Sequence, residues 1–258
     1  MGRRRIVIVG SGNVATHLAP ALDRCNDVVQ VVARSVESAS KVASLTRGAK
    51  PCSKLSEVEH DADFYIVSVN DDAVAAVAKD MPRVSGIVAH TSGSVPMDAL
   101  GGVSEKVGVF YPLQTFSRDA SVDVGRVPFF IEGNTPECAE ELAVLARTIS
   151  QSVDFADSSR RAVLHLAAVF ACNFSNYMWD CADTILADAG LSLDVMRPLL
   201  EVTLDKAMTL GPRAAQTGPA RRHDYGVIRA QSARLPRNLS KIYDILSQGI
   251  IANHIDNE

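Results

Sequence analysis

The fold of this chain is decided near its start, by the sequence IVIVGSGNVA at residues 6–15. Four β-branched residues predict a short buried strand, and the pattern G-x-G-x-x-A that follows it opens a helical stretch over 14–22. The first glycine permits a tight turn, the second allows a phosphate to approach the backbone, and the small Ala15 lets helix and strand pack closely. A helix N-terminus also attracts anions through its free N–H groups.

This strand, turn and helix predict a dinucleotide-binding site, for which an ordinary glycine turn is the simpler alternative. The cofactor-binding residues that the turn supplies are Gly10, Ser11, Gly12, Asn13 and Val14.

The residues after the second expected strand, 28–33, indicate which dinucleotide is bound. NAD enzymes carry an Asp or Glu at this place to bind the ribose 2′-hydroxyl, but this chain has Arg34 and Ser35. A guanidinium pairs with a 2′-phosphate in a bidentate way, and a serine hydroxyl can donate to it. We therefore expect NADP (as NADPH), with NAD, FAD and S-adenosylmethionine less favoured and a solvated arginine as the simple alternative.

The organisation of the chain changes near residue 154. Before it, short apolar runs alternate with helical patterns, which is typical of a parallel sheet with crossover helices. After it we expect helices alone, over 160–186, 198–210, 225–235 and 237–251. The sequence thus predicts an α/β fold, with a Rossmann-type, mostly parallel sheet domain over 1–153 and an all-α domain over 154–258.

Composition excludes several classes of protein. The chain has 258 residues, and its 26 Lys and Arg against 30 Asp and Glu give a net charge of −4, which argues against a dedicated nucleic-acid binder. Five cysteines without a C-x-x-C pair indicate free, buried thiols in a reducing compartment and no structural zinc. The apolar runs are too short to cross a membrane, and no signal peptide is visible. We expect a cytoplasmic protein without metal, nucleic acid or membrane partners.

Polar residues lie at the ends of the strands expected over 64–69 and 86–90, where ligands bind in open α/β sheets. Val69 and Asn70 join the predicted cofactor site, whereas Asp71 and Asp72 are expected to cap a helix. The segment His90-Thr91-Ser92-Gly93-Ser94 combines an imidazole with three hydroxyls. We assign His90 and Ser92 to catalysis and Ser94 to substrate binding, against the alternative of a polar turn.

Two groups of polar residues in the helical half are further candidates. His165, Asn173 and Asn176 fall at about 0°, 80° and 20° around one uniform helix and form a polar stripe among apolar neighbours. We assign all three to catalysis, although a structural histidine is the usual alternative. Thr217 and Arg222, in a loop around Gly218-Pro219, are assigned to an anionic substrate, against a solvated helix connection.

The chain resembles, over nearly its full length, proteins with a Rossmann-like domain followed by a DUF2520 domain. The residues that carry the resemblance are the Gly10–Ala15 turn, His90–Ser94, FYPLQTF at 110–116, the His165–Asn176 helix, and Thr217-Gly218-Pro219-Ala220 with Arg222 and Asp224. The branch is similar to coenzyme F420-dependent NADP oxidoreductases, pyrroline-5-carboxylate reductases and 6-phosphogluconate or β-hydroxyacid dehydrogenases.

The resemblance implies an NADP-binding domain and a 6-phosphogluconate-dehydrogenase-like helical domain that dimerises and shares its cleft between subunits. Ser92 is similar to the substrate-binding serine of the β-hydroxyacid dehydrogenases. Their K-x-x-x-N lysine is absent, because Val169 and Cys172 stand four residues before Asn173 and Asn176. Gln114, within the family segment, is assigned to substrate binding.

We therefore expect an NADP-dependent oxidoreductase that transfers a hydride between nicotinamide and a small C=O or C=N substrate in an interdomain cleft. A homodimer is expected to form through the helical domain. The missing lysine favours a rival interpretation, a non-catalytic NADP-binding sensor or regulatory protein. F420-linked hydride transfer is a third possibility.

Overall fold

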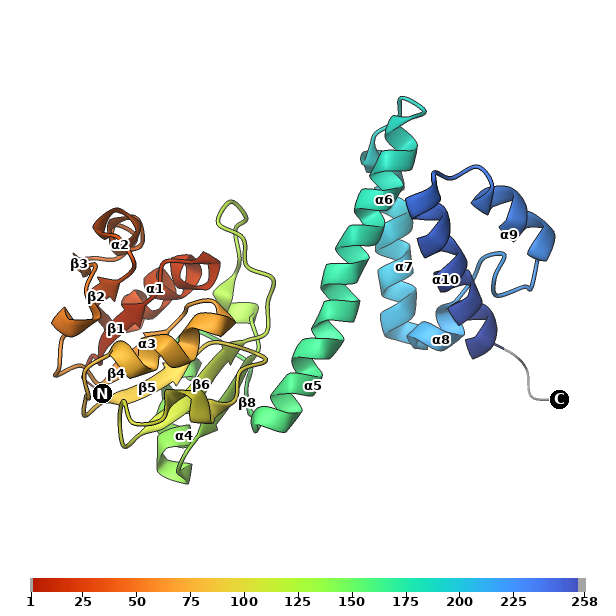
Figure 1. The fold of residues 1–258 in the computed structure, drawn as a ribbon. Helices are drawn as coiled ribbons and strands as arrows, with labels where there is room; N and C mark the ends of the chain where they lie inside the picture. Colours follow the sequence, from red (N-terminus) through yellow and green to blue (C-terminus); the bar gives the residue numbers. More distant parts are fainter. Residues whose placement is uncertain (1, 255–258) are drawn as a thin grey trace. The chain divides into compact units, whose positions relative to one another are not determined.

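The computed structural model describes residues 2–254 and divides into two compact units, of which the first ends at Cys172 and the second begins at Asn173. Unit 1 is built on an eight-stranded sheet with the order β3-β2-β1-β4-β5-β6-β7-β8 (Figure 1). All neighbouring strands are parallel except β6 and β7. The predicted α/β class with a mostly parallel sheet is confirmed. The strands are β1 (Arg5–Val9), β2 (Asp27–Val32), β3 (Lys50–Cys52), β4 (Phe64–Val67), β5 (Ile87–His90), β6 (Val107–Pro112), β7 (Phe129–Gly133) and β8 (Val153–Phe155).

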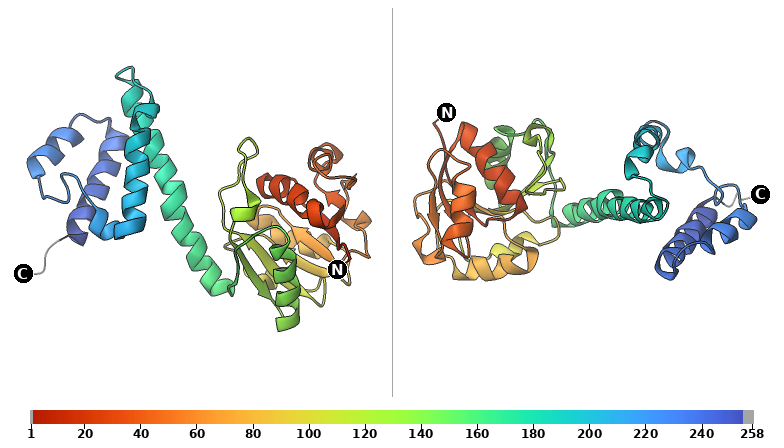
Figure 2. Two further views of the ribbon diagram at one scale, coloured as in Figure 1. Left: turned by 180° about the vertical axis from the view of Figure 1, so that it is seen from behind. Right: turned by 90° about the horizontal axis from the view of Figure 1, so that it is seen from above.

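Helices cover both faces of this sheet. Side chains alternate along β1, so that Ile6 and Ile8 face one apolar cluster while Val7 and Val9 face the other. Helices α1 (Asn13–Cys25), α2 (Val36–Ala43) and α4 (Pro136–Arg147) pack on the first face. Helix α3 (Val74–Asp80) packs on the second, as Figure 2 shows from two further sides. This burial on both faces explains why the strands read as continuous apolar runs.

Four short 3₁₀ turns connect these elements. They are η1 (Leu55–Glu57), η2 (Asp71–Ala73), η3 (Met97–Leu100) and η4 (Val124–Arg126).

Gly10 fixes the crossing of the chain from β1 into α1. Its φ is +127°, a region that residues with a side chain rarely adopt, and a Cβ there would lie 2.0 Å from the carbonyl oxygen of Ser68. Its amide donates to the carbonyl of Val32 at 2.7 Å, so the turn is tied to the end of β2. The end of β1 is thereby held against the ends of β2 and β4, where the strand order reverses and open sheets bind ligands.

Two strands differ from the sequence-based expectation. We expected no strand after residue 154, yet β8 spans Val153–Phe155 and pairs with β7, and the sequence also gave no indication of β3. Both strands have three residues and lie at the two edges of the sheet. An edge strand is buried on fewer sides, so it lacks the apolar run that indicates an inner strand.

The long helix predicted over 160–186 spans both units as three consecutive segments. These are α5 (Ser158–Ala168), a π-helical segment η5 (Val169–Phe174) and α6 (Ser175–Ala187). Asp157 is the N-cap of α5 and accepts a hydrogen bond from the amide of Arg160 at 2.8 Å. Unit 1 includes α5 and extends to Cys172, beyond the residue 153 at which we drew the first domain.

Unit 2 continues from α6 through helices alone. They are η6 (Leu193–Met196), α7 (Arg197–Leu210), α8 (Pro212–Ala215), α9 (Tyr225–Ser232) and α10 (Arg237–Asn253). Within its described part only Ala220, Ile228, Leu239 and Ser247 are buried. Large apolar side chains are instead exposed along α7 and α10, among them Leu199, Met208 and Ile245.

Between residues 2 and 254, no helix is long and apolar enough to span a membrane. The five cysteines are free, but only Cys52 and Cys138 are buried, so the expectation that all five are buried thiols is wrong.

Candidate functional site

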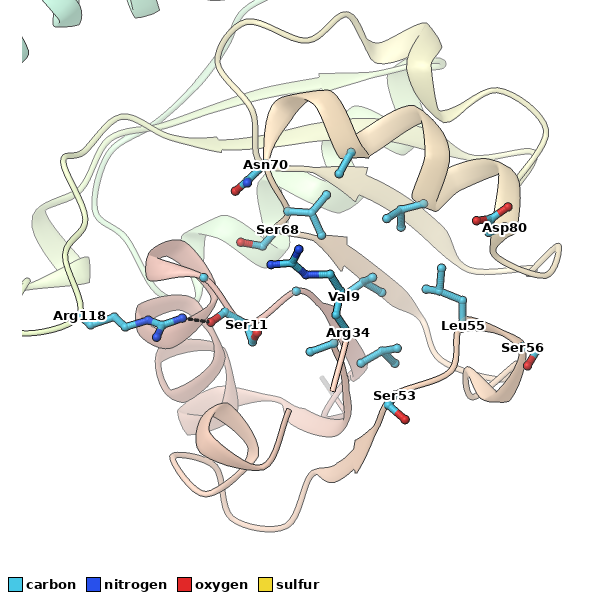
Figure 3. Close-up of a pocket in the computed structure, with 17 residues that line it drawn as sticks. Val9, Ser11, Arg34, Ser53, Leu55, Ser56, Ser68, Asn70, Asp80 and Arg118 are labelled. Atoms are coloured by element: carbon cyan, nitrogen blue, oxygen red, sulfur yellow. Dashed lines mark hydrogen bonds between the residues drawn. The ribbon is translucent and has the colours of Figure 1, made fainter. Parts of the chain in front are cut away.

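A cavity of about 640 Å³ opens at the carboxyl ends of β1, β2 and β4. Its lining combines the glycine turn with residues that follow β2, β3 and β4, as Figure 3 shows. Of the predicted cofactor residues, the structure places Gly10, Ser11, Gly12, Arg34, Val69 and Asn70 in this lining. The volume is typical of small-ligand pockets.

The N-terminus of α1 lies at this cavity, and no side chain caps its free backbone N–H groups. Its N-cap, Gly12, has no side chain to accept a hydrogen bond, and the first turn contains no acidic residue. The first amides of a helix have no partner within the helix, so they remain available to an anion. Asn13 does not serve as a cap either, since its Nδ2 donates to the carbonyl of Phe116 at 3.0 Å. Val14 is half-buried against the apolar cluster.

Arg34 extends its guanidinium into the cavity from the end of β2 (Figure 3). It is exposed, and within residues 2–254 no carboxylate lies within ion-pair distance of it. Ser35 has a different task, because its hydroxyl caps α2 by accepting from the amide of Ser38 at 3.2 Å. The one acidic residue in the lining is Asp80, which comes from the last turn of α3.

His90, the last residue of β5, is completely buried. Its Nδ1 accepts a hydrogen bond from the amide of Ser92 at 3.2 Å, which leaves the proton of the neutral ring on Nε2. Burial and the nearby Arg161 guanidinium lower the pKa of His90 to about 4. The imidazole is therefore neutral at physiological pH and holds the start of the loop that follows β5.

The hydroxyl of Ser92 shapes the same loop. It accepts hydrogen bonds from the amides of Ser94 and Val95, at 3.1 and 3.0 Å. The hydroxyl of Ser94 donates to the carboxylate of Asp71, which follows β4. The prediction that Asp71 or Asp72 caps a helix is thus wrong, because neither α3 nor the turn before it has a side-chain cap. The Asp71–Ser94 bond instead joins the loops that follow β4 and β5.

His165 lies against this loop from α5. Its Nδ1 is 3.1 Å from the hydroxyl of Tyr111, and the two rings meet edge to face. Burial raises the pKa of Tyr111 to about 12, so the phenol keeps its proton at neutral pH. A Cβ on Gly93 would lie 2.6 Å from His165 Nδ1 and 2.7 Å from Tyr111 Cζ, so only glycine allows this close approach.

A buried ion pair fixes α5 on the sheet. Arg161 is completely buried, and its Nη1 donates to the carboxylate of Glu132 in β7. Its Nη2 donates to the carbonyl of Val95 at 2.6 Å, directly after the Ser92–Ser94 turn. Ser158 also donates to Glu132, at 2.9 Å. This network positions His165 one turn further along the helix.

The remaining predicted residues lie outside this cluster. Asn173 and Asn176 are exposed side chains of unit 2. The stripe that we expected assumed a uniform helix, whereas the π segment between His165 and Asn176 has a wider turn and shifts the register. Gln114 is exposed and its Oε1 accepts from the amide of Thr115 at 2.7 Å. Thr217 and Arg222 line one open hollow in unit 2, together with Gln216, Gly218, Arg221 and His223.

The sequence did not indicate Tyr111, Glu132, Arg161 or Arg118 as functional. Each of these side chains contacts a residue that is far away in the sequence, so the spacing of neighbouring residues does not predict the contact. Only Tyr111 had a signal, since it lies in the 110–116 segment that carries the family resemblance. Over the part of the chain that the structure describes, no group of three His, Cys, Asp or Glu side chains is arranged to hold a metal ion.

The chain matches two domain families. Residues 1–114 match the Rossmann-like domain, and residues 127–250 match the domain of unknown function DUF2520. None of the curated proteins matches the chain in sequence.

Solved structures that are similar to this chain over most of its length include the following three. A "putative NADP oxidoreductase" from Bacteroides fragilis is 40% identical, with a TM-score of 0.88, covering 97% of this chain and 98% of its own. An imine reductase from a Pseudomonas species is 16% identical, with a TM-score of 0.66 and coverages of 96% and 93%. A reductive aminase from Aspergillus terreus, solved with NADPH and ethyl levulinate, is 15% identical, with a TM-score of 0.71 and coverages of 97% and 94%. The last two comparisons show the fold alone.

The buried His90 predicts a specific pH dependence of stability. Its pKa is about 4 in the folded protein against 6.5 when exposed, so the unfolded chain binds more protons between these values. The free energy of unfolding should fall by up to about 3 kcal/mol through this group as the pH drops from 7 to 4. Urea unfolding of the wild type and of His90→Gln measures it. The stability difference between the two should shrink over this range, and a constant difference would contradict the burial of a neutral imidazole.

Proposed function

Since the chain belongs to the family that joins a Rossmann-like domain to a DUF2520 domain, we propose that it is an NADP-dependent oxidoreductase. The observation that carries the proposal is the cavity at the switch point of the sheet. An uncapped helix N-terminus lines it together with Arg34, which has no ion-pair partner within residues 2–254. Both features attract phosphate. The Bacteroides fragilis relative, at 40% identity, carries an NADP oxidoreductase name, which supports the same cofactor.

The residues of the cavity fit NADP. Gly12 gives α1 no side-chain cap, so the first backbone N–H groups of the helix are open to a pyrophosphate. Arg34 stands at the end of β2, where the 2′-phosphate of NADP lies in this fold. The three residues directly after β2, Ala33, Arg34 and Ser35, include no carboxylate at the position that favours NAD. Asn70 and Val69 line the cavity from the end of β4. Ser35 remains a second candidate for the 2′-phosphate, with its hydroxyl engaged at the cap of α2.

The reaction that we propose is hydride transfer between nicotinamide and a small C=O or C=N substrate. NADPH supplies the hydride when it is bound, and the protein supplies position and a proton. Two structures with this fold are named imine reductase and reductive aminase, which supports C=N substrates as a class by analogy of fold.

His165 is the best-supported proton donor among the predicted residues. The hydroxyl of Tyr111 lies 3.1 Å from its Nδ1 and orients the ring, and we propose that the other ring nitrogen, Nε2, passes a proton to a substrate oxygen or nitrogen. His90 is less suited to this role, because it is completely buried and its pKa of about 4 keeps it neutral. His90 and Ser92 instead shape the loop against which His165 lies.

The other predicted residues complete the proposal as groups that orient substrate. Ser94 and Gln114 offer polar side chains near the carboxyl ends of β5 and β6, and Asn173 and Asn176 offer amides on the long helix. Thr217 and Arg222 line the hollow in unit 2, in which neither Arg221 nor Arg222 has an ion-pair partner within residues 2–254. Two unpaired guanidinium groups favour an anionic group there.

A non-catalytic NADP-binding sensor is the second candidate. Val169 and Cys172 occupy the positions at which the β-hydroxyacid dehydrogenases carry their catalytic lysine, four residues before an asparagine. This departure removes one route to proton transfer, and the Tyr111–His165 pair is the feature that favours an enzyme over a sensor.

We also propose that the protein is a homodimer that assembles through unit 2. This unit buries only three apolar side chains in its described part, which is too few to stabilise an isolated helical domain. Leu199, Val202 and Met208 on α7 and Ile245 on α10 are each more than half exposed. A second copy of the same chain is the partner with the matching surface. The free cysteines are consistent with a reducing compartment such as the cytoplasm.

The cofactor assignment predicts the effect of Arg34→Gln. Removal of a charged, bidentate contact to the 2′-phosphate should weaken NADPH binding by about 10- to 100-fold. NADH lacks that phosphate, so its affinity should stay within about twofold of the wild type. Fluorescence titration with both nucleotides measures this. Equal NADPH affinity in the wild type and the variant would show that the 2′-phosphate lies elsewhere.

The proposed role of His165 predicts that its loss lowers turnover and leaves the affinity for NADPH unchanged. His165→Ala should lower kcat for NADPH-dependent reduction by about 100-fold or more, and Tyr111→Phe should lower it less, because the imidazole remains. A screen of keto-acids, aldehydes and cyclic imines finds the substrate. The affinity for NADPH should be unchanged in both variants. If the wild type reduces none of these substrates while it binds NADPH, the sensor is the better proposal.

The proposed assembly predicts the mass of the protein in solution. Light scattering at micromolar concentration should give about twice the 27.6 kDa of one chain. Met208→Glu, which places a charge on the exposed apolar face of α7, should shift the mass towards one chain. A wild-type mass of 27.6 kDa would refute the homodimer.

A further inference from the structure

The segment 116–118, which we call the strap, lies across the N-terminal turn of α1. The carbonyl of Phe116 accepts from Asn13 Nδ2 at 3.0 Å, and the carbonyl of Ser117 lies 2.8 Å from His17 Nε2. The rings of Phe116 and His17 also stack, with centroids 5.2 Å apart. A segment that follows β6 is thus held against the glycine turn that follows β1.

Arg118, the last residue of the strap, enters the proposed cofactor cavity. Its Nη2 donates to the carbonyl of Ser11, in the middle of the glycine turn, at 2.8 Å, and its side chain is one of those that line the cavity (Figure 3). A guanidinium has five N–H donors, and this bond uses one of them. Across residues 2–254 no carboxylate lies within ion-pair distance of Arg118.

The charges at this point are of one sign. The N-terminus of α1 carries a partial positive charge, and it has neither a side-chain cap nor an acidic residue in its first turn. Arg118 adds a full positive charge next to the turn that opens this helix. Because the helix N-terminus and Arg118 are both positive, an anion bound between them is attracted by both. The group that a dinucleotide presents to this turn is its pyrophosphate.

We propose that Arg118 is a second phosphate-binding arginine of the cofactor site, which contacts the pyrophosphate while Arg34 contacts the 2′-phosphate. This inference rests on the proposed function, since it assumes that the cavity binds NADP. It divides the recognition of one ligand between two arginines from separate parts of the chain. Arg118 contributes to the affinity for any dinucleotide, and Arg34 selects NADP over NAD.

Three probes separate the two phosphate contacts. NADPH carries both the pyrophosphate and the 2′-phosphate, NADH carries only the pyrophosphate, and adenosine 2′-monophosphate carries only the 2′-phosphate. Calorimetric or fluorescence titrations of the full chain give the dissociation constant of each probe without any need for activity. The variants are Arg118→Gln and Arg34→Gln, which remove the same charge at the two positions.

The two variants should give opposite patterns. Arg118→Gln should weaken NADPH and NADH by about tenfold each and leave adenosine 2′-monophosphate within about twofold. Arg34→Gln should weaken NADPH and adenosine 2′-monophosphate and leave NADH unchanged. Arg118→Lys should recover part of the lost NADH affinity, because it restores the charge but not the planar fork.

Arg126→Gln is the matched control. Arg126 is an exposed arginine of the same loop region that does not line the cavity, so its loss changes the net charge alone and should leave all three affinities unchanged. The melting temperature of Arg118→Gln without ligand should equal that of the wild type, because the Asn13 and His17 contacts still hold the strap.

Two results would overturn the inference. One is an Arg118→Gln variant that binds NADPH and NADH as tightly as the wild type. The other is an equal loss for all three probes, which indicates a general disturbance of the cavity. In both results NADPH binding by the wild type leaves the proposed function standing. A wild-type chain that binds none of the probes overturns the proposed function and, with it, this inference.

Discussion

The buried ion pair between Arg161 and Glu132 is the interaction on which the arrangement of the candidate site depends. A guanidinium that is removed from water needs a partner for its charge, and here Nη1 donates to a carboxylate of β7 and Nη2 to the carbonyl of Val95, while the buried Nε has no partner among residues 2–254. One partner lies in β7 and the other in the loop that follows β5, so the start of α5 is held at two separate points of unit 1. That position brings His165 to Tyr111, over a glycine that leaves room for both rings.

The cofactor cavity and the His165 cluster are parts of one edge of the sheet. Asn70 lines the cavity, and its neighbour Asp71 accepts a hydrogen bond from Ser94, in the loop against which His165 lies. The carboxyl ends of parallel strands place these loops side by side without any further constraint. The residues that fit the cofactor and the proton donor that we propose, His165, therefore all belong to unit 1.

The sequence predicted the features that depend on local spacing. The glycine turn needs neighbours within a few residues, and Arg34 needs only its place after a strand, so both were visible in the chain. The inner strands were visible because burial on both faces leaves continuous apolar runs. Arg118 and Arg161 were not, because an arginine is exposed by default and its role comes from partners far away in sequence. The edge strand β8 lacked the apolar run altogether.

The helical half was harder to predict for a different physical reason. The polar stripe assumed about 100° per residue along the whole helix, but the π segment Val169–Phe174 changes that rotation before Asn176 is reached. After the π segment, unit 2 buries few apolar side chains in its described part, so few packing contacts restrain the side chains on its surface. Periodicity places Asn173 and Arg222 on a helix or in a loop, while their orientation depends on what covers the exposed apolar faces. In the homodimer that we propose, the second copy would cover those faces and set the orientation of these side chains.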